Sequence, residues 1–84
     1  MVLVEVFSGE GCHLCESAVT TLVRLQKLHP FELRETIIEE GDPLFEGMKD
    51  RIPVIHIGGR YAFHYRVREA EFISKLNAAA AERP

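Results

Sequence analysis

Cysteine is scarce in this sequence: among 84 residues only Cys12 and Cys15 occur, three residues apart. A secreted mini-protein stapled by disulfides needs more cysteines, spread along the chain so that the bridges close long loops. A bridge between these two would close a very short loop, so we exclude a stapling role. Redox chemistry and metal binding remain, in a compartment that we expect to be the reducing cytoplasm.

Long apolar runs and a surplus of positive charge are also missing. No stretch approaches the roughly 20 apolar residues of a membrane-spanning helix. The apolar start of the chain is short and carries Glu5, so we expect no membrane partner and no signal peptide. The formal net charge of −3 lacks the clustered Lys and Arg that bind phosphates, which excludes nucleic acid as the main partner. At this length we expect one domain over residues 1–84, folding alone as a monomer.

Apolar residues recur with strand and helix periods in alternating segments. A short β-branched run, a helical stripe that Pro30 ends and a second alternating run predict a parallel β-α-β unit. Asp42 followed by Pro43 marks a helix start, because the first caps the initial turn and the second suits its backbone. The predicted elements are strands over 2–7, 31–38, 53–57 and 60–65, a helix of about four turns from Cys12, a short helix from Asp42 to about Lys49, and a C-terminal helix through Ala70, Ile73, Leu76 and Ala80 that frays before Pro84.

Side-chain placement follows from the same patterns. The first helix should bury one stripe, formed by Leu14, Ala18, Leu22, Leu25 and Leu28. Gly58-Gly59 between apolar runs predicts a two-residue hairpin in which Ile57 faces Arg60 and His56 faces Tyr61. Simple alternation then puts Val54, His56, Tyr61, Phe63 and Tyr65 on one face, and Ile55, Ile57, Ala62 and His64 on the other.

Three short segments accompany the predicted order β-α-β-α-β-β-α. They are Phe7-Ser8, Gly11-Cys12-His13-Leu14-Cys15-Glu16, and Arg51-Ile52-Pro53-Val54 ahead of the glycine hairpin. With these segments in this order, the whole chain resembles the thioredoxin superfamily, and in particular short glutaredoxin-like proteins with a C-H-L-C motif. The resemblance implies an α/β fold with a four-stranded mixed sheet flanked by helices, and the activity of a thiol-disulfide oxidoreductase with a redox-active disulfide.

The spacing of the two cysteines suits a reversible disulfide. Three residues apart at the start of a helix, their Cα atoms would lie about 5 Å from each other, which a disulfide tolerates. Cys12 would occupy the helix N-terminus, where unpaired N–H groups and the helix dipole lower the pKa of a thiol, so we predict it as the nucleophile. Cys15, one turn deeper, would resolve the mixed disulfide with the substrate.

The resemblance also implies a cis bond between Ile52 and Pro53, beside the dithiol. A proline there cannot ligate metal, and the backbone of Ile52 stays free to pair with an extended substrate as if adding a strand. Typical glutaredoxins carry a lysine shortly before the cysteines and a glycine pair after the fourth strand, whereas this chain has Gly9-Glu10 and Phe63-His64. We therefore expect no cofactor, and both the added bulk and the charge of Glu10 disfavour dependence on glutathione.

Three further residues are candidates for the substrate site. His13, between the cysteines, would stabilise the Cys12 thiolate when protonated or serve only as a solvated helix residue, and the two interpretations weigh equally. His64 would lie at the same end of the sheet as Pro53, although plain packing explains it better. Arg51 would bind the carboxylate of a peptide or of glutathione, against the alternative of a merely solvated arginine.

Two alternatives to redox catalysis stay open. A C-x-x-C at a strand-to-helix turn can hold Cu(I) or Zn(II), although such metal carriers end in a strand and two cysteines leave a zinc site short of ligands. We assign no metal ligand. The other alternative is a redox-inactive binding module on the same fold. The redox interpretation requires a disulfide-containing protein or a small thiol as partner, and a reductant that the sequence does not identify.

Overall fold

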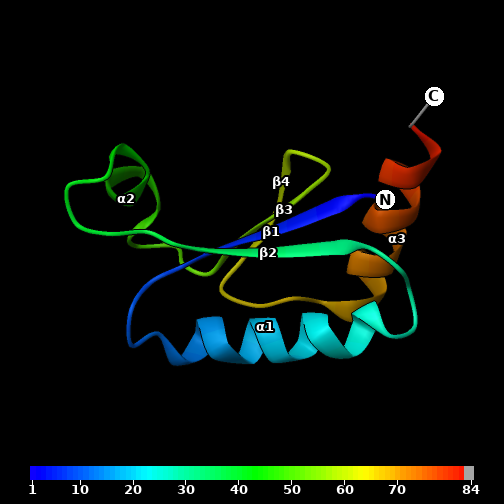
Figure 1. Ribbon diagram of the computed structural model, residues 1–84, viewed down its shortest axis with the longest axis horizontal. Helices are drawn as coiled ribbons and strands as arrows, with labels where there is room; N and C mark the ends of the chain where they lie inside the picture. The colour runs from blue at the N-terminus through cyan, green and yellow to red at the C-terminus, as the bar shows by residue number, and fades with distance from the viewer. Residues whose placement is uncertain (83–84) are drawn as a thin grey trace.

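The computed structural model describes residues 1–82, and its elements follow the predicted order β-α-β-α-β-β-α (Figure 1). The strands are β1 (Leu3–Ser8), β2 (Glu32–Ile37), β3 (Val54–Ile57) and β4 (Arg60–His64), and the helices are α1 (His13–Gln26), α2 (Pro43–Met48) and α3 (Glu69–Ala81). None of these helices is long and apolar enough to cross a membrane. The predicted domain range of 1–84 and the expected fraying before Pro84 reach residues 83 and 84, which lie outside the described residues.

The four strands form one mixed sheet in the order β2-β1-β3-β4. β1 and β2 are parallel, and β3 runs antiparallel to both β1 and β4. A parallel pair needs a long crossover between its strands, and α1 supplies it. Because β1 and β2 are parallel, their carboxyl ends lie at the same end of the sheet, and the loops after Ser8 and after Ile37 both leave it there.

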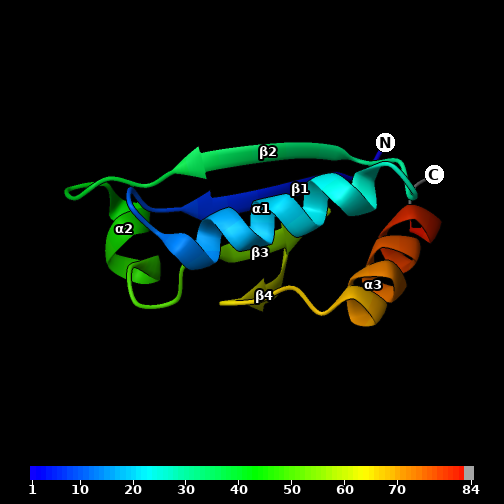
Figure 2. The same ribbon diagram turned by 90° about the horizontal axis from the view of Figure 1, so that it is seen from below.

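Helices cover the two faces of the sheet unequally. α1 and α3 pack on one face, where Leu22 and Phe72 meet Val6 in the main hydrophobic core. α2 packs on the opposite face, where Phe45 lies against Phe7 in a second, smaller core near the carboxyl end of β1. Figure 2 shows α1 running along the sheet, with α2 at one end of the molecule and α3 at the other. The end with α2 also holds the start of α1.

α1 buries the predicted stripe in its middle but not at its ends. Ala18, Leu22 and Leu25 are buried, whereas Leu14 is 48% exposed and Leu28 is 69% exposed. Cys15, only 1% exposed, starts the stripe in place of Leu14, since it lies three residues before Ala18 and thus on the same face. Leu28 follows the end of the helix, so the helical period no longer sets its direction.

The glycine hairpin has the predicted turn but a different register further from it. The two residue pairs nearest the turn are as predicted. A bulge then sets Ile55 opposite Phe63, so that Ala62 is the extra residue on β4. Simple alternation therefore gives the wrong faces beyond this point: Phe63 joins the main core, and His64 lies opposite Val54.

Candidate active site at the start of the first helix

Cys12 and Cys15 are joined by a disulfide at the point where the chain turns from β1 into α1. Their Cα atoms are 5.2 Å apart, as the helical spacing predicts. Cys12 is the N-cap of α1: its backbone is extended, its carbonyl accepts the N–H of Glu16, and its Sγ accepts the N–H of Cys15 at 3.1 Å. A backbone donor and the positive end of the helix dipole thus both face the Cys12 sulfur.

The two cysteine residues differ in exposure. Cys15 is 1% exposed and lies under the first turn of α1, whereas Cys12 is only half-buried. Leu14, between them, extends outward and leaves an apolar side chain at the surface beside the disulfide. A partner molecule can therefore approach Cys12 but not Cys15.

The loop before the disulfide is built on glycines. The N–H of Cys12 donates to the carbonyl of Gly9, and Gly11 has a φ of +72°, which favours glycine. A Cβ at position 9 would lie 2.5 Å from Cδ1 of Ile52, so the side chain of Ile52 occupies the space above the Gly9 backbone. The lysine that typical glutaredoxins carry in this loop would displace Ile52 if it stood at position 9.

Pro53 lies next to this loop, immediately before β3. The Ile52–Pro53 peptide bond is cis, and the Pro53 side chain is less than 2% exposed. Phe7 pairs with Val54 across the sheet, so the preceding residue, Pro53, lies beside the last residue of β1. Within residues 1–82 the backbone of Ile52 forms no hydrogen bond, which leaves its N–H and carbonyl available to an extended segment.

Tyr65 holds the segment from Asp50 to Pro53 through two hydrogen bonds, a role that sequence reasoning missed. Its N–H donates to the carbonyl of Pro53 at 2.9 Å, and its hydroxyl donates to the carbonyl of Asp50 at 2.6 Å. Its φ of 69° is unusual for a residue other than glycine. No pattern in the sequence marks this role, because it depends on two backbone carbonyls brought near by the fold.

The other predicted site residues, His13, Arg51 and His64, are exposed. His13 is almost fully exposed and pairs with Glu16 at 3.6 Å. Arg51 is exposed just before the Pro53 segment. His64 lies at the sheet end of Pro53, as expected, and its ring contacts Tyr65 while its Nδ1 is hydrogen-bonded to the hydroxyl of Tyr61. The contacts of His64 are thus with β4 and its continuation, on the face away from α1.

Ser8, at the end of β1, is the second residue that sequence reasoning missed as a member of the site. It is 1% exposed and is the one buried polar side chain among residues 1–82. Its hydroxyl has no hydrogen-bond partner, which costs about 1–3 kcal/mol for a buried group. A serine before a glycine loop gives no sequence signal of this kind, because burial is set by α1 folding back over the strand.

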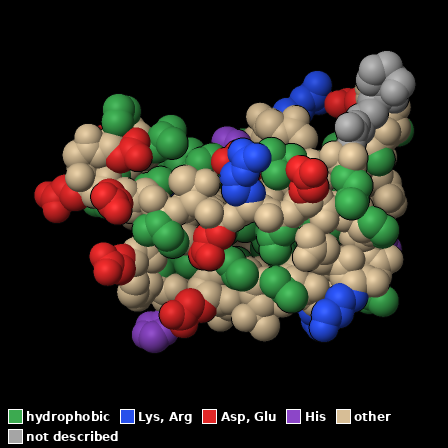
Figure 3. Space-filling model, in the orientation of Figure 1, with side chains coloured by type: hydrophobic (Ala, Val, Ile, Leu, Met, Phe, Trp, Pro, Cys, Tyr) green, Lys and Arg blue, Asp and Glu red, His purple; other side chains and the backbone are tan. Residues whose placement is uncertain are grey.

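Negative charge is concentrated in the two segments of the chain that contain the disulfide and α2. Residues 8–16 and 37–53 contain seven acidic and two basic side chains, a formal charge of −5 against −3 for the whole chain. Figure 3 shows acidic side chains over the end of the molecule that holds α2 and the start of α1. The acidic residues of segments 8–16 and 37–53 are Glu10, Glu16, Glu39, Glu40, Asp42, Glu46 and Asp50, and the basic ones are Lys49 and Arg51.

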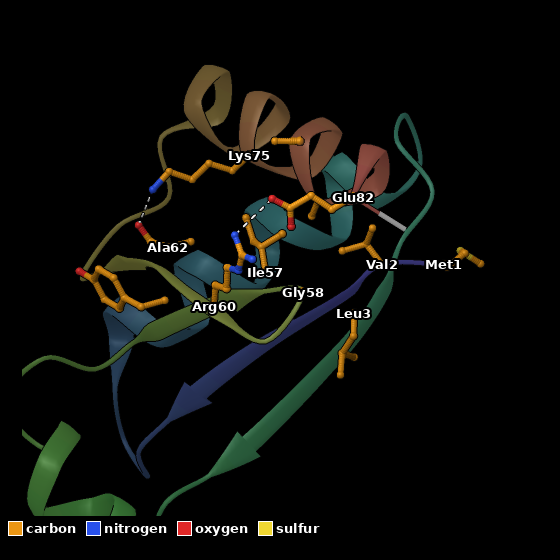
Figure 4. Close-up of a pocket in the computed structure, with 12 residues that line it drawn as sticks. Met1, Val2, Leu3, Ile57, Gly58, Arg60, Ala62, Lys75 and Glu82 are labelled. Carbon is orange, nitrogen blue, oxygen red and sulfur yellow. Dashed lines mark hydrogen bonds and ion pairs between the residues drawn. The ribbon is translucent and has the colours of Figure 1, made fainter. Parts of the chain in front are cut away.

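A cavity lies at the other end of the sheet. It has a volume of about 540 Å³ and opens between the glycine hairpin, the start of the chain and α3 (Figure 4). Arg60 and Glu82 form an ion pair across its rim, and Lys75 donates to the carbonyl of Ala62. None of the predicted site residues lines this cavity, so it is separate from the dithiol.

A disulfide at the N-terminus of the first helix, next to Pro53 on a β2-β1-β3-β4 sheet, defines a dithiol protein of the thioredoxin fold. The family model that matches is that of the glutaredoxin-like domain (DUF836), over residues 3–77. The chain therefore belongs to the glutaredoxin-like domain family. The recognition of family and fold from the sequence is thus confirmed.

Solved structures agree with this assignment. The solution NMR structure of protein Ne2328 from Nitrosomonas europaea is 31% identical, with a TM-score of 0.79 over 89% of this chain and 91% of that one. The crystal structure of thioredoxin f2 from Chlamydomonas reinhardtii is 15% identical, with a TM-score of 0.63 over 99% of this chain and 81% of that one. A protein of unknown function from Staphylococcus aureus is 13% identical, with a TM-score of 0.61 over 98% and 94%. The last two show the fold alone. No curated protein matches the chain significantly.

Proposed function

We propose that the protein is a thiol-disulfide oxidoreductase acting on protein or small-molecule disulfides, with Cys12 as the nucleophile and Cys15 as the resolving cysteine. One observation carries the proposal: the two disulfide-bonded cysteines differ in exposure. Cys12 is half-buried at the N-cap of α1, and Cys15 is 1% exposed beneath it. The accessible sulfur can meet a substrate, whereas the shielded one can reach only its neighbour.

In the reducing direction the cycle starts from the dithiol. The Cys12 thiolate, stabilised by the N–H of Cys15 and by the α1 terminus, attacks one sulfur of a substrate disulfide RS–SR′. A bond forms between Cys12 and RS, the substrate S–S bond breaks, and R′S⁻ leaves and takes up a proton. The Cys15 thiol then loses its proton and attacks the Cys12 sulfur, which releases RSH and restores the disulfide.

The segment around Pro53 is the proposed docking site for the substrate. The free backbone groups of Ile52 would pair with an extended stretch of the substrate chain, as in strand addition. Tyr65 holds this segment through the carbonyls of Pro53 and Asp50, so the docking groups are fixed before the substrate arrives. Arg51 and Leu14 are both exposed, and we expect them to contact residues that flank the substrate disulfide.

Regeneration of the dithiol requires two electrons and two protons from an external thiol, which is itself oxidised to a disulfide. We propose a small thiol or a thiol reductase as this partner, in a reducing cytoplasm, and no resident cofactor. Glutathione is a poor candidate, because Ile52 fills the space above Gly9 and the charge around the site repels its carboxylates. His13, paired with Glu16 at the surface, would at most adjust the charge near Cys12.

A redox titration combined with turnover assays tests the proposal. The protein is equilibrated with dithiothreitol at set ratios of its reduced and oxidised forms, and free thiols are counted by alkylation. We expect one reversible two-electron transition, and turnover of a protein disulfide that the Cys12→Ser variant lacks. Two cysteines that alkylate like free cysteine and form no bridge in oxidising buffer would contradict it. Tight 1:1 binding of Cu(I) or Zn(II) without any turnover would favour the metal carrier instead.

A further inference from the structure

Ser8 occupies a position where an apolar residue would be expected. Every other buried side chain among residues 1–82 is apolar or a cysteine, and the Ser8 hydroxyl has no partner in the disulfide form of the protein. Unpaired buried hydroxyls destabilise a fold, so this one is a defect, or it bonds a trapped water, or its partner belongs to another state of the molecule. The other chemical state of this protein is the reduced form, in which Cys12 and Cys15 are thiols.

The pleat of β1 places Ser8 on the α1 side of the sheet. Val4 and Val6 belong to the main core under α1, whereas Phe7 belongs to the core under α2. Residues two apart on a strand share a face, so Ser8 lies on the face of Val4 and Val6. Ser8 is also the last residue of β1, and α1 folds back over this strand from its first turn onward.

Cys15 is buried on that same side, under the first turn of α1. Both residues are 1% exposed, and Ser8 is followed by the loop that leads into the dithiol. Ala18 and Pro53, which are also buried, have no polar side-chain atom. A disulfide sulfur can already accept a hydrogen bond, as Cys12 Sγ does from the N–H of Cys15, so what reduction adds at Cys15 is a buried S–H donor for the oxygen of a hydroxyl.

We propose that Ser8 is a positioning residue whose hydroxyl hydrogen-bonds the Cys15 sulfur in the dithiol form and thereby stabilises the reduced protein. The proposal rests on the proposed redox function. The reaction concerned is the two-electron reduction by a dithiol: the Cys12–Cys15 S–S bond breaks, both sulfurs take up a proton, and the dithiol reductant becomes a cyclic disulfide. The Ser8 hydroxyl gains a partner in the product and has none in the reactant.

The direction of the effect follows from this difference. Removing the hydroxyl relieves an unpaired group in the disulfide form and deletes a hydrogen bond in the dithiol form. Both changes favour the disulfide, so a variant without the hydroxyl is harder to reduce than the natural protein. A hydroxyl that bonded a trapped water in both forms would instead affect the two forms equally and leave the redox equilibrium unchanged.

The test measures the equilibrium constant with dithiothreitol for two matched pairs, Ser8 against Ser8→Ala and Ser8→Thr against Ser8→Val. The second pair differs only in a hydroxyl and a methyl of the same shape, so it corrects for packing. Ser17→Ala, at an exposed position of α1, is the control. We expect loss of the hydroxyl to shift the equilibrium toward the disulfide by about 3- to 10-fold, the effect of one hydrogen bond, with no shift in the control.

Denaturant unfolding of each variant in both redox forms supplies a second readout. The proposal expects loss of the hydroxyl to destabilise the dithiol form relative to the disulfide form by the same factor as the redox shift. Equal changes in both forms, or an unchanged equilibrium constant in both pairs, would overturn it and leave Ser8 a packing residue. The equilibrium with dithiothreitol needs no biological substrate, so failure of the turnover assays would refute the proposed function and not the role of Ser8.

Discussion

At the scale of single residues, exposure assigns the two sulfurs to different steps. Replacing Cys15 by serine leaves Cys12 able to attack a substrate but removes the thiol that releases it. We therefore expect Cys15→Ser to accumulate a mixed disulfide with a protein substrate, and Cys12→Ser to form none. Mass spectrometry under non-reducing conditions measures the adduct. Equal adduct formation by both variants would show that Cys15 is not shielded in the working protein.

The contact between Gly9 and Ile52 gives a second prediction. A Cβ at position 9 would meet Cδ1 of Ile52 at 2.5 Å, and this methyl is the far end of a side chain that can rotate away. We expect Gly9→Ala to reduce stability by about 1 kcal/mol, and much less when Ile52→Val has already removed that methyl. Urea unfolding of the two single variants and the double variant measures the coupling. Additive effects on stability would mean that the backbone of the loop, and not the Ile52 side chain, determines the cost of a side chain at position 9.

The chemistry of the site could be predicted from the sequence to the extent that it depends on local spacing. Cys12 and Cys15 are three residues apart at a strand-to-helix turn, and both their disulfide distance and the cap position follow from helix geometry. Ser8 and Tyr65 could not be predicted in the same way. Their roles depend on burial under α1 and on carbonyls more than ten residues away in the chain, which no local pattern encodes.

At the scale of elements, α2 is the least buried helix and is stabilised mainly by local interactions. It spans six residues, none of them buried, and the Asp42 side chain caps it by accepting the N–H of Leu44. Gly47 lies inside the helix, and a Cβ added there would meet nothing within 4 Å. Its conformational freedom therefore weakens the helix without serving a close contact.

Substitutions at the cap of α2 and inside the helix should consequently act in opposite directions. Asp42→Ala removes the cap and should cost about 1 kcal/mol, whereas Asp42→Ser keeps an acceptor and should cost much less. Gly47→Ala should stabilise the helix by about 0.5–1 kcal/mol, because alanine loses less backbone entropy. Hydrogen exchange of the α2 amides, compared with denaturant unfolding, measures both. An unchanged exchange rate in Asp42→Ala would show that packing against Phe7 and Val54, and not the cap, holds the helix.

The order of the elements could be predicted from the sequence, but the faces of β4 could not. Element order followed from period and turn residues, because each of those signals is local. The faces of β4 did not, since a bulge opposite Ile55 shifts Phe63 into the core and turns His64 outward. A bulge is chosen by which side chains fill the core, so alternation alone cannot place it.

At the scale of the whole molecule, charge is distributed unevenly along the sheet. The dithiol end carries a formal −5, so the rest of the chain carries +2. Glu10 and Glu16 flank the disulfide in sequence and are both exposed. An accessible thiolate in a negative field meets cationic partners more often than anionic ones, and salt screens this effect over about 10 Å at 0.1 M.

We therefore expect a peptide disulfide flanked by lysine to be reduced several-fold faster than the same peptide flanked by glutamate, with the ratio falling toward one as salt is raised to about 1 M. Stopped-flow kinetics with the two peptides at several salt concentrations measure the ratio. The double variant Glu10→Gln, Glu16→Gln should lower it at low salt. The double variant Glu32→Gln, Glu71→Gln removes the same charge elsewhere, on the first residue of β2 and on α3, and should leave it nearly unchanged. A ratio that both double variants reduce equally would mean that net charge, and not its position at the dithiol, selects the partner.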